Sequence, residues 1–223
     1  PCPDAEEEQA LTELRGWAQR SMQRRDSKAE HLLDWLQQTL CPGGVWNRTR
    51  VVIFTEYMDT QHYLAELLNK SGMGGERLIC LNGATSAQER ERFKAAFQAD
   101  PDTSPVRILL GTDAASEGIN LQNHCSRLIH YEIPWNPSRL EQRNGRGARK
   151  GNIVAKEYAG NKVKAYVYAV LRTLDAYKLN LLHNKQQFID QLKRNRLGAR
   201  RLDEGAISED SGMNFAEWMA VVS

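Results

Sequence analysis

The order of apolar and polar positions along the chain predicts an alternation of strands and helices. Apolar runs without polar alternation are typical of strands that are buried on both faces of a sheet. Such runs cover 50–55, 77–81, 106–110 and 127–131, and a run rich in aromatic and β-branched residues covers 163–171. Between and after them, helical spacing of apolar residues predicts helices around 63–68, 85–97, 137–146 and 173–196. This alternation favours an α/β fold, a doubly wound parallel sheet flanked by helices.

Segments at both ends of the chain extend this pattern. The pattern of polar and apolar positions predicts helices over 5–24 and 27–40. It also predicts a loop over 198–212 and a short last helix over 214–222. Asp26 or Ser27 is suited to cap the second of these helices. We therefore expect a helical lead-in over 1–45, a sheet domain over 46–183 and a basic helical and loop extension over 184–223.

Composition excludes several classes of protein. Hydrophobic residues make up 41% of the 223 residues and charged residues 26%, unlike collagen-like or globally disordered chains. Apolar runs such as Val51–Phe54 are too short for a membrane span, and no secretory signal follows Pro1. The four cysteines lie far apart in the sequence, without the close pairing of zinc ligands. We expect reduced thiols in a cytoplasmic protein, and a start without Met indicates a piece of a longer one.

The formal net charge of +2 hides an uneven distribution of charge. Residues 1–20 hold five acids and two arginines, whereas residues 139–151 hold five basic residues and one acid. Arginines interleaved with glycines suit the recognition of phosphate oxygens. Arg146 and Arg149 are three positions apart, so a helical turn places them on one face. The alternative is an ordinary basic helix end, and the basic end of the last long helix is open to the same two interpretations.

Small and polar residues crowd into 111–122, directly after the third predicted strand. In open parallel sheets, ligands bind beyond the carboxyl ends of the strands. Thr112, Ser116 and Asn120 therefore suit contacts with a nucleic-acid backbone or a ribose hydroxyl, although an ordinary capped strand–helix loop is the alternative. The chain has no Gly-x-x-x-x-Gly-Lys-Ser/Thr loop, so it does not by itself cradle the phosphates and magnesium of a nucleotide.

Six segments in a fixed order resemble the motifs of one family. They are 27–33, Val51–Tyr57 (motif IV), Leu81–Gly83, Ile108–Gln122 (motif V), His130–Pro137 and Gln142–Gly151 (motif VI). Together they resemble the second, C-terminal RecA-like domain of bacterial Swi/Snf-type superfamily-two helicases and translocases. Within that group the chain looks most like relatives of the RNA-polymerase-recycling translocase and helicases of phage-defence systems. The order and spacing agree over 27–182, which makes the combination specific although each motif alone is weak.

The resemblance implies an ATP site that this chain shares with an N-terminal lobe. Arg149 would be the arginine finger that reaches the γ-phosphate, Arg146 its partner, and Gln142 would line the same cleft. Gly118 and Asn120 would approach the ribose. ATP with Mg²⁺ would be held mainly by an N-terminal RecA-like lobe of the same protein. The full-length parent would then be an ATP-dependent helicase or translocase, and the isolated chain is expected to be inactive.

The resemblance also implies a face for nucleic acid. Thr112, Ser116 and Glu117 would lie near the backbone of double-stranded DNA, and Thr55 and Gly83 are further candidates for this face. Components of a defence system or RNA polymerase are additional expected partners, whereas a membrane is not.

The turn between the two arginines departs from the family pattern. Relatives usually read Gly-Arg-Ile-Asp-Arg where this chain has Gly145-Arg146-Gly147-Ala148-Arg149. The change loosens the turn and removes a carboxylate that could orient an arginine. It keeps open a second class of function, a non-catalytic nucleic-acid-binding or protein-docking module with a decayed nucleotide face. A third interpretation is a motor that acts on RNA or displaces bound protein.

Overall fold

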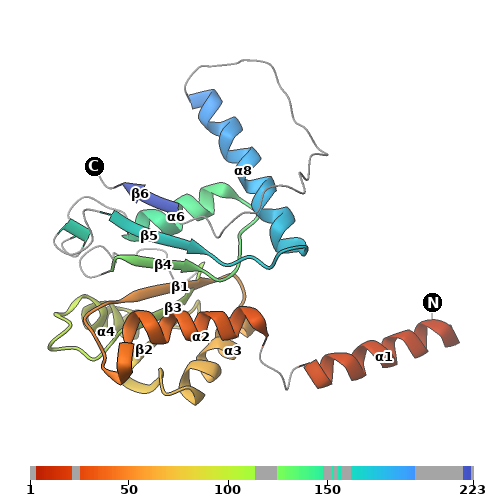
Figure 1. The fold of residues 1–223 in the computed structure, drawn as a ribbon, viewed down its shortest axis with the longest axis horizontal. Helices are drawn as coiled ribbons and strands as arrows, with labels where there is room; N and C mark the ends of the chain where they lie inside the picture. The colour runs from red at the N-terminus through yellow and green to blue at the C-terminus, as the bar shows by residue number, and fades with distance from the viewer. Residues whose placement is uncertain are drawn as a thin grey trace.

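A mixed sheet forms the centre of the molecule. The computed structural model describes residues 4–21, 26–113, 125–147, 152, 155–156, 162–193 and 218–221. Within these ranges the sheet has six strands in the order β2-β3-β1-β4-β5-β6 (Figure 1). The strands are β1 (Val51–Thr55), β2 (Leu78–Leu81), β3 (Ile108–Thr112), β4 (Arg127–His130), β5 (Lys162–Val167) and β6 (Trp218–Val221). Because β1 to β5 all run parallel, the predicted parallel α/β sheet is confirmed.

Helices connect and flank these strands. They are α1 (Ala5–Ser21), α2 (Ser27–Leu40), α3 (Met58–Lys70), α4 (Ala87–Gln98), α6 (Pro137–Gly147) and α8 (Leu174–Lys193), with short 3₁₀ turns η1 (Pro42–Gly44) and η2 (Gly75–Arg77). Two helix starts follow capping rules. The Asp26 side chain accepts a hydrogen bond from the backbone N–H of Ala29, and Ser86 and Glu89 form a reciprocal capping box. The predicted cap at Asp26 is confirmed for α2, and the same kind of local signal marks the start of α4.

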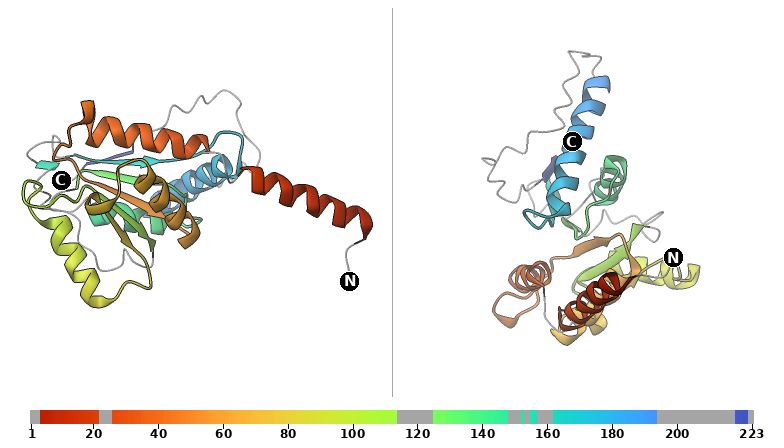
Figure 2. Two further views of the ribbon diagram at one scale, coloured as in Figure 1. Left: turned by 90° about the horizontal axis from the view of Figure 1, so that it is seen from below. Right: turned by 90° about the vertical axis from the view of Figure 1, so that its right-hand side faces the viewer.

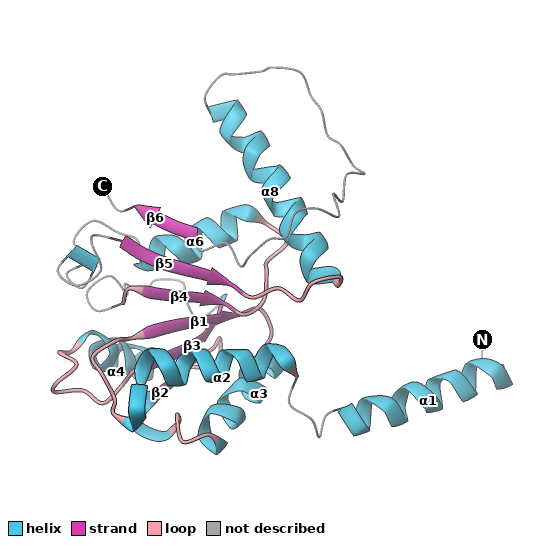
Figure 3. Ribbon diagram, in the orientation of Figure 1, coloured by secondary structure: helices cyan, strands magenta, loops and turns pink. Residues whose placement is uncertain are grey.

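Alternate residues of β1 face two different helical layers, and all five are buried. Val51 and Ile53 pack in one cluster with the apolar faces of α2 and α3. Val52 and Phe54 pack on the opposite face, where Phe97 of α4 completes the cluster. Figure 2 shows α2 and α4 on opposite sides of the sheet, and Figure 3 shows the loops gathered at the strand ends. Burial of both faces explains why this strand has no polar alternation.

The last strand corrects one prediction. The sequence suggested a short helix over 214–222, but residues 218–221 form β6, which pairs antiparallel with β5. The edge of β5 would otherwise present a row of unpaired backbone N–H and C=O groups. Pairing along that edge satisfies these groups, and this long-range gain overrides the weak helical preference of so short a segment.

The first helix stands apart from the layered core. None of the α1 residues is buried, and Leu11, Leu14 and Trp17 are all more than half exposed. Figure 1 shows α1 extending away from the sheet. Helix α1 therefore contributes little to the stability of the sheet domain.

Cys41, Cys80 and Cys125 are free thiols, as the sequence predicted, and Cys2 lies outside the described residues. Burial raises the pKa of the Cys80 and Cys125 thiols to about 11, so both stay protonated at neutral pH. In the part of the chain that the structure describes, no helix is both long and apolar enough to cross a bilayer.

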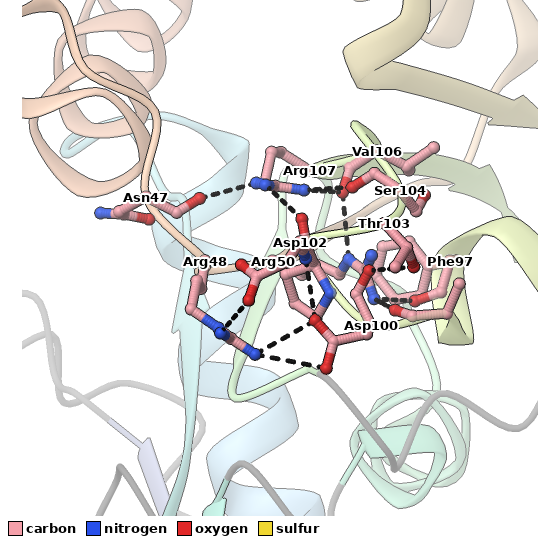
Figure 4. A network of polar contacts seen from close by, with 12 residues as sticks. Asn47, Arg48, Arg50, Phe97, Asp100, Asp102, Thr103, Ser104, Val106 and Arg107 are labelled. Carbon is pink, nitrogen blue, oxygen red and sulfur yellow. Dashed lines mark hydrogen bonds and ion pairs between the residues drawn. The ribbon is translucent and has the colours of Figure 1, made fainter.

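Buried arginines organise the amino edge of the sheet (Figure 4). Arg50 is 1% exposed, and its guanidinium donates hydrogen bonds to the carbonyl oxygens of Val106 (3.0 Å), Phe97 (2.6 Å) and Ala99 (2.6 Å). It thereby ties the end of α4 and the approach to β3 onto β1. Burial, and then the nearby charge of Arg107, lower the pKa of Arg50 to about 10, which still leaves it protonated at neutral pH.

Replacing Arg50 by Lys tests this network. A lysine keeps the charge but has a single nitrogen, which cannot reach the three carbonyl groups that the planar guanidinium group contacts. Buried acceptors therefore lose their donors. We expect the free energy of unfolding to fall by about 2–4 kcal/mol. Arg48 is the matched control, because its ion pairs with Asp100 and Asp102 are exposed, and Arg48→Lys should change stability by less than about 1 kcal/mol. Urea unfolding of both variants measures the difference, and equal losses would contradict the prediction.

Candidate functional site

Three predicted site residues meet at the carboxyl edge of the sheet. Thr55 and Thr112 are register partners at the ends of β1 and β3, and Gly83 lies in the turn just beyond β2. Gly83 is exposed, whereas Thr55 and Thr112 are 0% and 4% exposed. The structure therefore brings these residues to one edge, with the two threonine side chains beneath the surface.

A glutamine that the motif analysis missed supports the Gly83 turn. Gln61 of α3 is 1% exposed, and its amide nitrogen donates to the carbonyl oxygens of Leu81 (2.7 Å) and Leu110 (2.9 Å). Its amide oxygen accepts a hydrogen bond of 3.1 Å from the side chain of Asn82. The sequence carried a signal, since Gln61 is a polar residue three positions before Leu64 on the buried face of α3.

Helix α6 carries the predicted nucleotide-facing residues. Gln142 is exposed and Arg146 is partly exposed, and because they are one helical turn apart they lie on one side of α6. Arg149 lies outside the described residues, as do Ser116, Glu117, Gly118 and Asn120. The structure thus places two of the predicted nucleotide contacts on the accessible side of one helix.

The neighbouring arginine has a different environment. Arg143 is 2% exposed, and its Nε lies 2.5 Å from Asp113 Oδ1, directly after β3. Asp113 Oδ2 also lies 3.6 Å from Nη1 of Arg139, one turn earlier on α6. Two of the three arginines in this helix therefore direct their charge at one carboxylate of the same lobe. This leaves Arg146 as the arginine of α6 in the described residues with no ion pair to a carboxylate.

His130 anchors the same helix from the end of β4. Its Nε2 lies 2.8 Å from Asn144 Oδ1, and its ring stacks on Phe54 with a centroid distance of 5.6 Å. Complete burial, followed by the charge of Arg143, lowers the pKa of His130 to about 3. His130 is therefore a neutral donor to Asn144 at working pH.

Glu132 caps α3 from a different strand end. Its Oε2 accepts hydrogen bonds from the backbone N–H groups of Glu56 (2.6 Å) and Tyr57 (3.3 Å), and its Oε1 accepts one from the Thr60 hydroxyl (2.8 Å). The N-cap residue, Tyr57, supplies no side-chain cap of its own. A carboxylate at a helix N-terminus is favoured by the helix dipole as well as by the free N–H groups.

A cavity of about 640 Å³ opens beside this cap. It is lined by five carboxylate and two lysine residues, together with three tyrosines and other side chains: Asp26, Glu56, Asp59, Glu132, Asp175, Lys28, Lys178, Tyr57, Tyr63 and Tyr131. An excess of carboxylates repels phosphate groups. The accessible side of α6 is therefore better suited to a nucleotide phosphate than this cavity.

The unusual Gly147 has a packing role. A Cβ atom added at Gly147 would lie 3.1 Å from Leu128 Cδ2 on β4, closer than ordinary van der Waals contact. Its absence lets α6 approach the sheet closely. The departure from the family pattern at this position is therefore accommodated by the core.

Comparison with known proteins identifies the family. Residues 28–151, more than half of the chain, match the model of the helicase conserved C-terminal domain, and the chain belongs to this family. The predicted resemblance is thus confirmed. The uncharacterized ATP-dependent helicase YqhH of Bacillus subtilis is 34% identical over 143 residues, which cover 64% of this chain and 23% of that protein. The Zorya protein ZorD of Escherichia coli is 32% identical over 124 residues, which cover 53% and 11%.

A solved structure has the same fold. The C-terminal part of the Fun30 ATPase domain superposes with a TM-score of 0.58 at 20% identity, covering 71% of this chain and 46% of that one. At this identity the likeness concerns the RecA-like fold alone. The chain spans less than a quarter of the length of the two curated relatives it matches.

Burial of His130 predicts a dependence of stability on pH. Above pH 6.5 neither the folded nor the unfolded state protonates this residue. Below pH 6.5 the unfolded state binds a proton at His130, whereas the folded state binds it only near pH 3. The free energy of unfolding therefore falls by up to about 1.4 kcal/mol for each pH unit in this window. Urea unfolding between pH 7 and pH 5 should show a smaller slope for His130→Gln than for the natural chain. Identical slopes would show that His130 does not cause this pH dependence.

Two glycines of α6 form a matched pair for a test of packing. A Cβ at Gly145 would meet nothing within 4 Å, so Gly145→Ala should stabilise the chain by about 0.5–1 kcal/mol through helix propensity. Gly147→Ala should lose that gain because its Cβ crowds Leu128. Thermal unfolding of both variants measures the difference. An equal rise in Tm for the two would show that Leu128 does not restrict this site.

Proposed function

We propose that this chain is the second motor lobe of an ATP-dependent DNA helicase or translocase. Family membership and the name of the relative YqhH, an uncharacterized ATP-dependent helicase, support a helicase parent that uses ATP. The observation that carries the proposal is the difference in pairing along α6: Arg139 and Arg143 pair with Asp113, whereas Arg146 does not. Such a helix offers a positive charge to a ligand from outside the lobe.

The residues present fit the phosphate end of ATP as a substrate shared with a first RecA-like lobe. Arg146 and Gln142 would face the nucleotide, and Arg149 would be the arginine finger beyond them. Gly118 and Asn120 would approach the ribose. Mg²⁺ and most phosphate contacts would belong to the first lobe, because nothing in this sequence forms a phosphate-binding glycine loop.

Arginines at this place would act on charge that develops during phosphoryl transfer. In the transition state negative charge spreads over the oxygens of the transferred group, and a positioned guanidinium stabilises it. The arginines reach that group only when the two lobes close. Closure on ATP and opening after hydrolysis would then shift the grip on nucleic acid.

The nucleic-acid face would lie at the ends of β1, β2 and β3. Gly83 is exposed there and would approach double-stranded DNA, together with Ser116 and Glu117. Because the side chains of Thr55 and Thr112 are buried, we propose that they support this face from below rather than touch the backbone. Closure of the cleft would move these segments together because they belong to one sheet.

The organisation and surroundings of the chain are also proposals. We infer a lead-in over 1–45, a motor lobe over 46–183 and an extension over 184–223, which would begin within the continuous helix α8. The protein would act in the cytoplasm, and its partners would include the first lobe and components of a defence system or of RNA polymerase. A further relative, the defense against restriction protein B of Escherichia phage P1, supports the defence interpretation by its name.

Substitution of the two arginines tests the function. In a protein that joins this chain to a Walker-type first lobe, Arg149→Ala should lower the kcat of ATP hydrolysis by roughly 10³-fold or more, and Arg146→Ala by roughly 10²-fold. Binding of double-stranded DNA should change little, because neither residue belongs to the proposed DNA face. Arg48→Ala, at the opposite edge of the sheet, is the control.

Coupled ATPase and DNA-binding assays measure both quantities. Full turnover by both arginine variants would overturn the motor proposal. DNA binding without any turnover in the natural protein would instead favour the non-catalytic module. Turnover stimulated by RNA but not by DNA would show an RNA motor.

A further inference from the structure

We propose that Arg143 is a positioning residue that joins three segments of the motor lobe and sets where α6 presents Arg146. The inference rests on the proposed function and concerns a residue that itself faces neither nucleotide nor DNA. Arg143 lies inside the lobe, 2% exposed, where the end of β1 meets the residues that follow β3 and β4.

The guanidinium of Arg143 meets a different segment on each side. Its Nε lies 2.5 Å from Asp113 Oδ1, which follows β3, and its Nη1 donates a hydrogen bond of 3.0 Å to the carbonyl oxygen of Glu132, which follows β4. Its Cζ lies 5.7 Å from the centre of the Phe54 ring in β1. One planar group therefore fixes the relative positions of three strand ends.

Glu132 extends this connection to the start of α3. While its carbonyl group accepts from Arg143, its carboxylate accepts from the backbone N–H groups of Glu56 and Tyr57 and from the Thr60 hydroxyl. The chain of contacts thus runs from α6 to the segment after β1. The proposed nucleotide-facing helix and the proposed DNA-facing edge are joined through polar contacts that are mostly part-buried.

Two further contacts act together with Arg143 to define one orientation of α6 on the sheet. Asn144 is bonded to His130, and Gly147 packs closely against Leu128. A rotation of α6 would break these contacts and the Asp113 ion pair together. Arg146 lies three positions after Arg143, so its direction depends on the same orientation of the helix.

Arginine is required here because of its shape. A lysine has one nitrogen, which cannot contact Asp113 and the Glu132 carbonyl group with the same flat geometry. A buried ion pair contributes little net stability compared with an apolar replacement, but its direction can specify one arrangement of the groups around it. Arg143 therefore suits a role in geometry more than a role in holding the lobe folded.

The test uses the protein that contains both lobes and compares Arg143→Lys with Arg139→Lys. Both arginines pair with Asp113 from the same helix, but the Arg139 side chain is 57% exposed and lies 3.6 Å away. Arg143→Lys should lower the kcat of DNA-stimulated ATP hydrolysis about tenfold or more, as expected when a transition-state contact is misplaced. The KM for ATP and the Kd for DNA should stay within about threefold, and Arg139→Lys should resemble the natural protein.

A double-mutant cycle provides the second measurement. Asp113→Asn should lower kcat to a similar extent, and combining it with Arg143→Lys should add little, because both variants break one interaction. Losses that multiply would show independent roles and overturn the proposal. A parallel fall in kcat, DNA-binding capacity and Tm would also overturn it, because it would indicate a merely structural role, and so would variants that fail to fold.

The proposed function is tested separately in the same assay. If Arg143→Lys retains turnover within twofold while Arg146→Ala and Arg149→Ala lose it, the positioning role is wrong and the motor lobe stands. If none of the three variants changes turnover, the motor proposal itself fails.

Discussion

Burial of β1 on both faces is the constraint on which the rest of the structure depends. Because its five residues are all buried, polar groups at the two ends of the strand need partners from elsewhere in the fold. At the amino end, Arg50 provides donors for the carbonyl groups of the neighbouring elements. At the carboxyl end, Glu132 accepts from the backbone just after β1, and Arg143 lies over Phe54. The candidate site thus rests on the same constraint as the core.

The arginines of α6 show how burial assigns roles within one charged motif. In the sequence Arg139, Arg143 and Arg146 are three basic residues within one short segment. In the fold, Arg143 is enclosed and paired with Asp113, which is thirty positions earlier, whereas Arg146 stays partly exposed. A helix that binds its own lobe through one arginine can present the next one in a defined direction. This is the physical basis of both proposals.

Much of the fold was predictable because it depends on local patterns. The apolar runs located β1 to β5, and the helical spacing of apolar residues located α4. Strand β6 was not predictable, because its conformation depends on pairing with β5 rather than on its own residues. The same reason hid the roles of Gln61, Glu132 and Arg143. Their partners include Leu81, Glu56 and Asp113, which lie 20, 76 and 30 positions away along the chain.

The sequence by itself determined the family, the order of the motifs, the parallel α/β architecture and the spacing of the arginines in motif VI. These depend on residue identity and on periods of two or 3.6 residues, which are readable along one segment. Only the tertiary structure decided that the side chains of Thr55 and Thr112 lie below the surface, that Gly147 admits Leu128, and that Asp113 engages Arg143. Desolvation and close packing join residues that are distant in the chain, so these properties exist only once the layers have assembled.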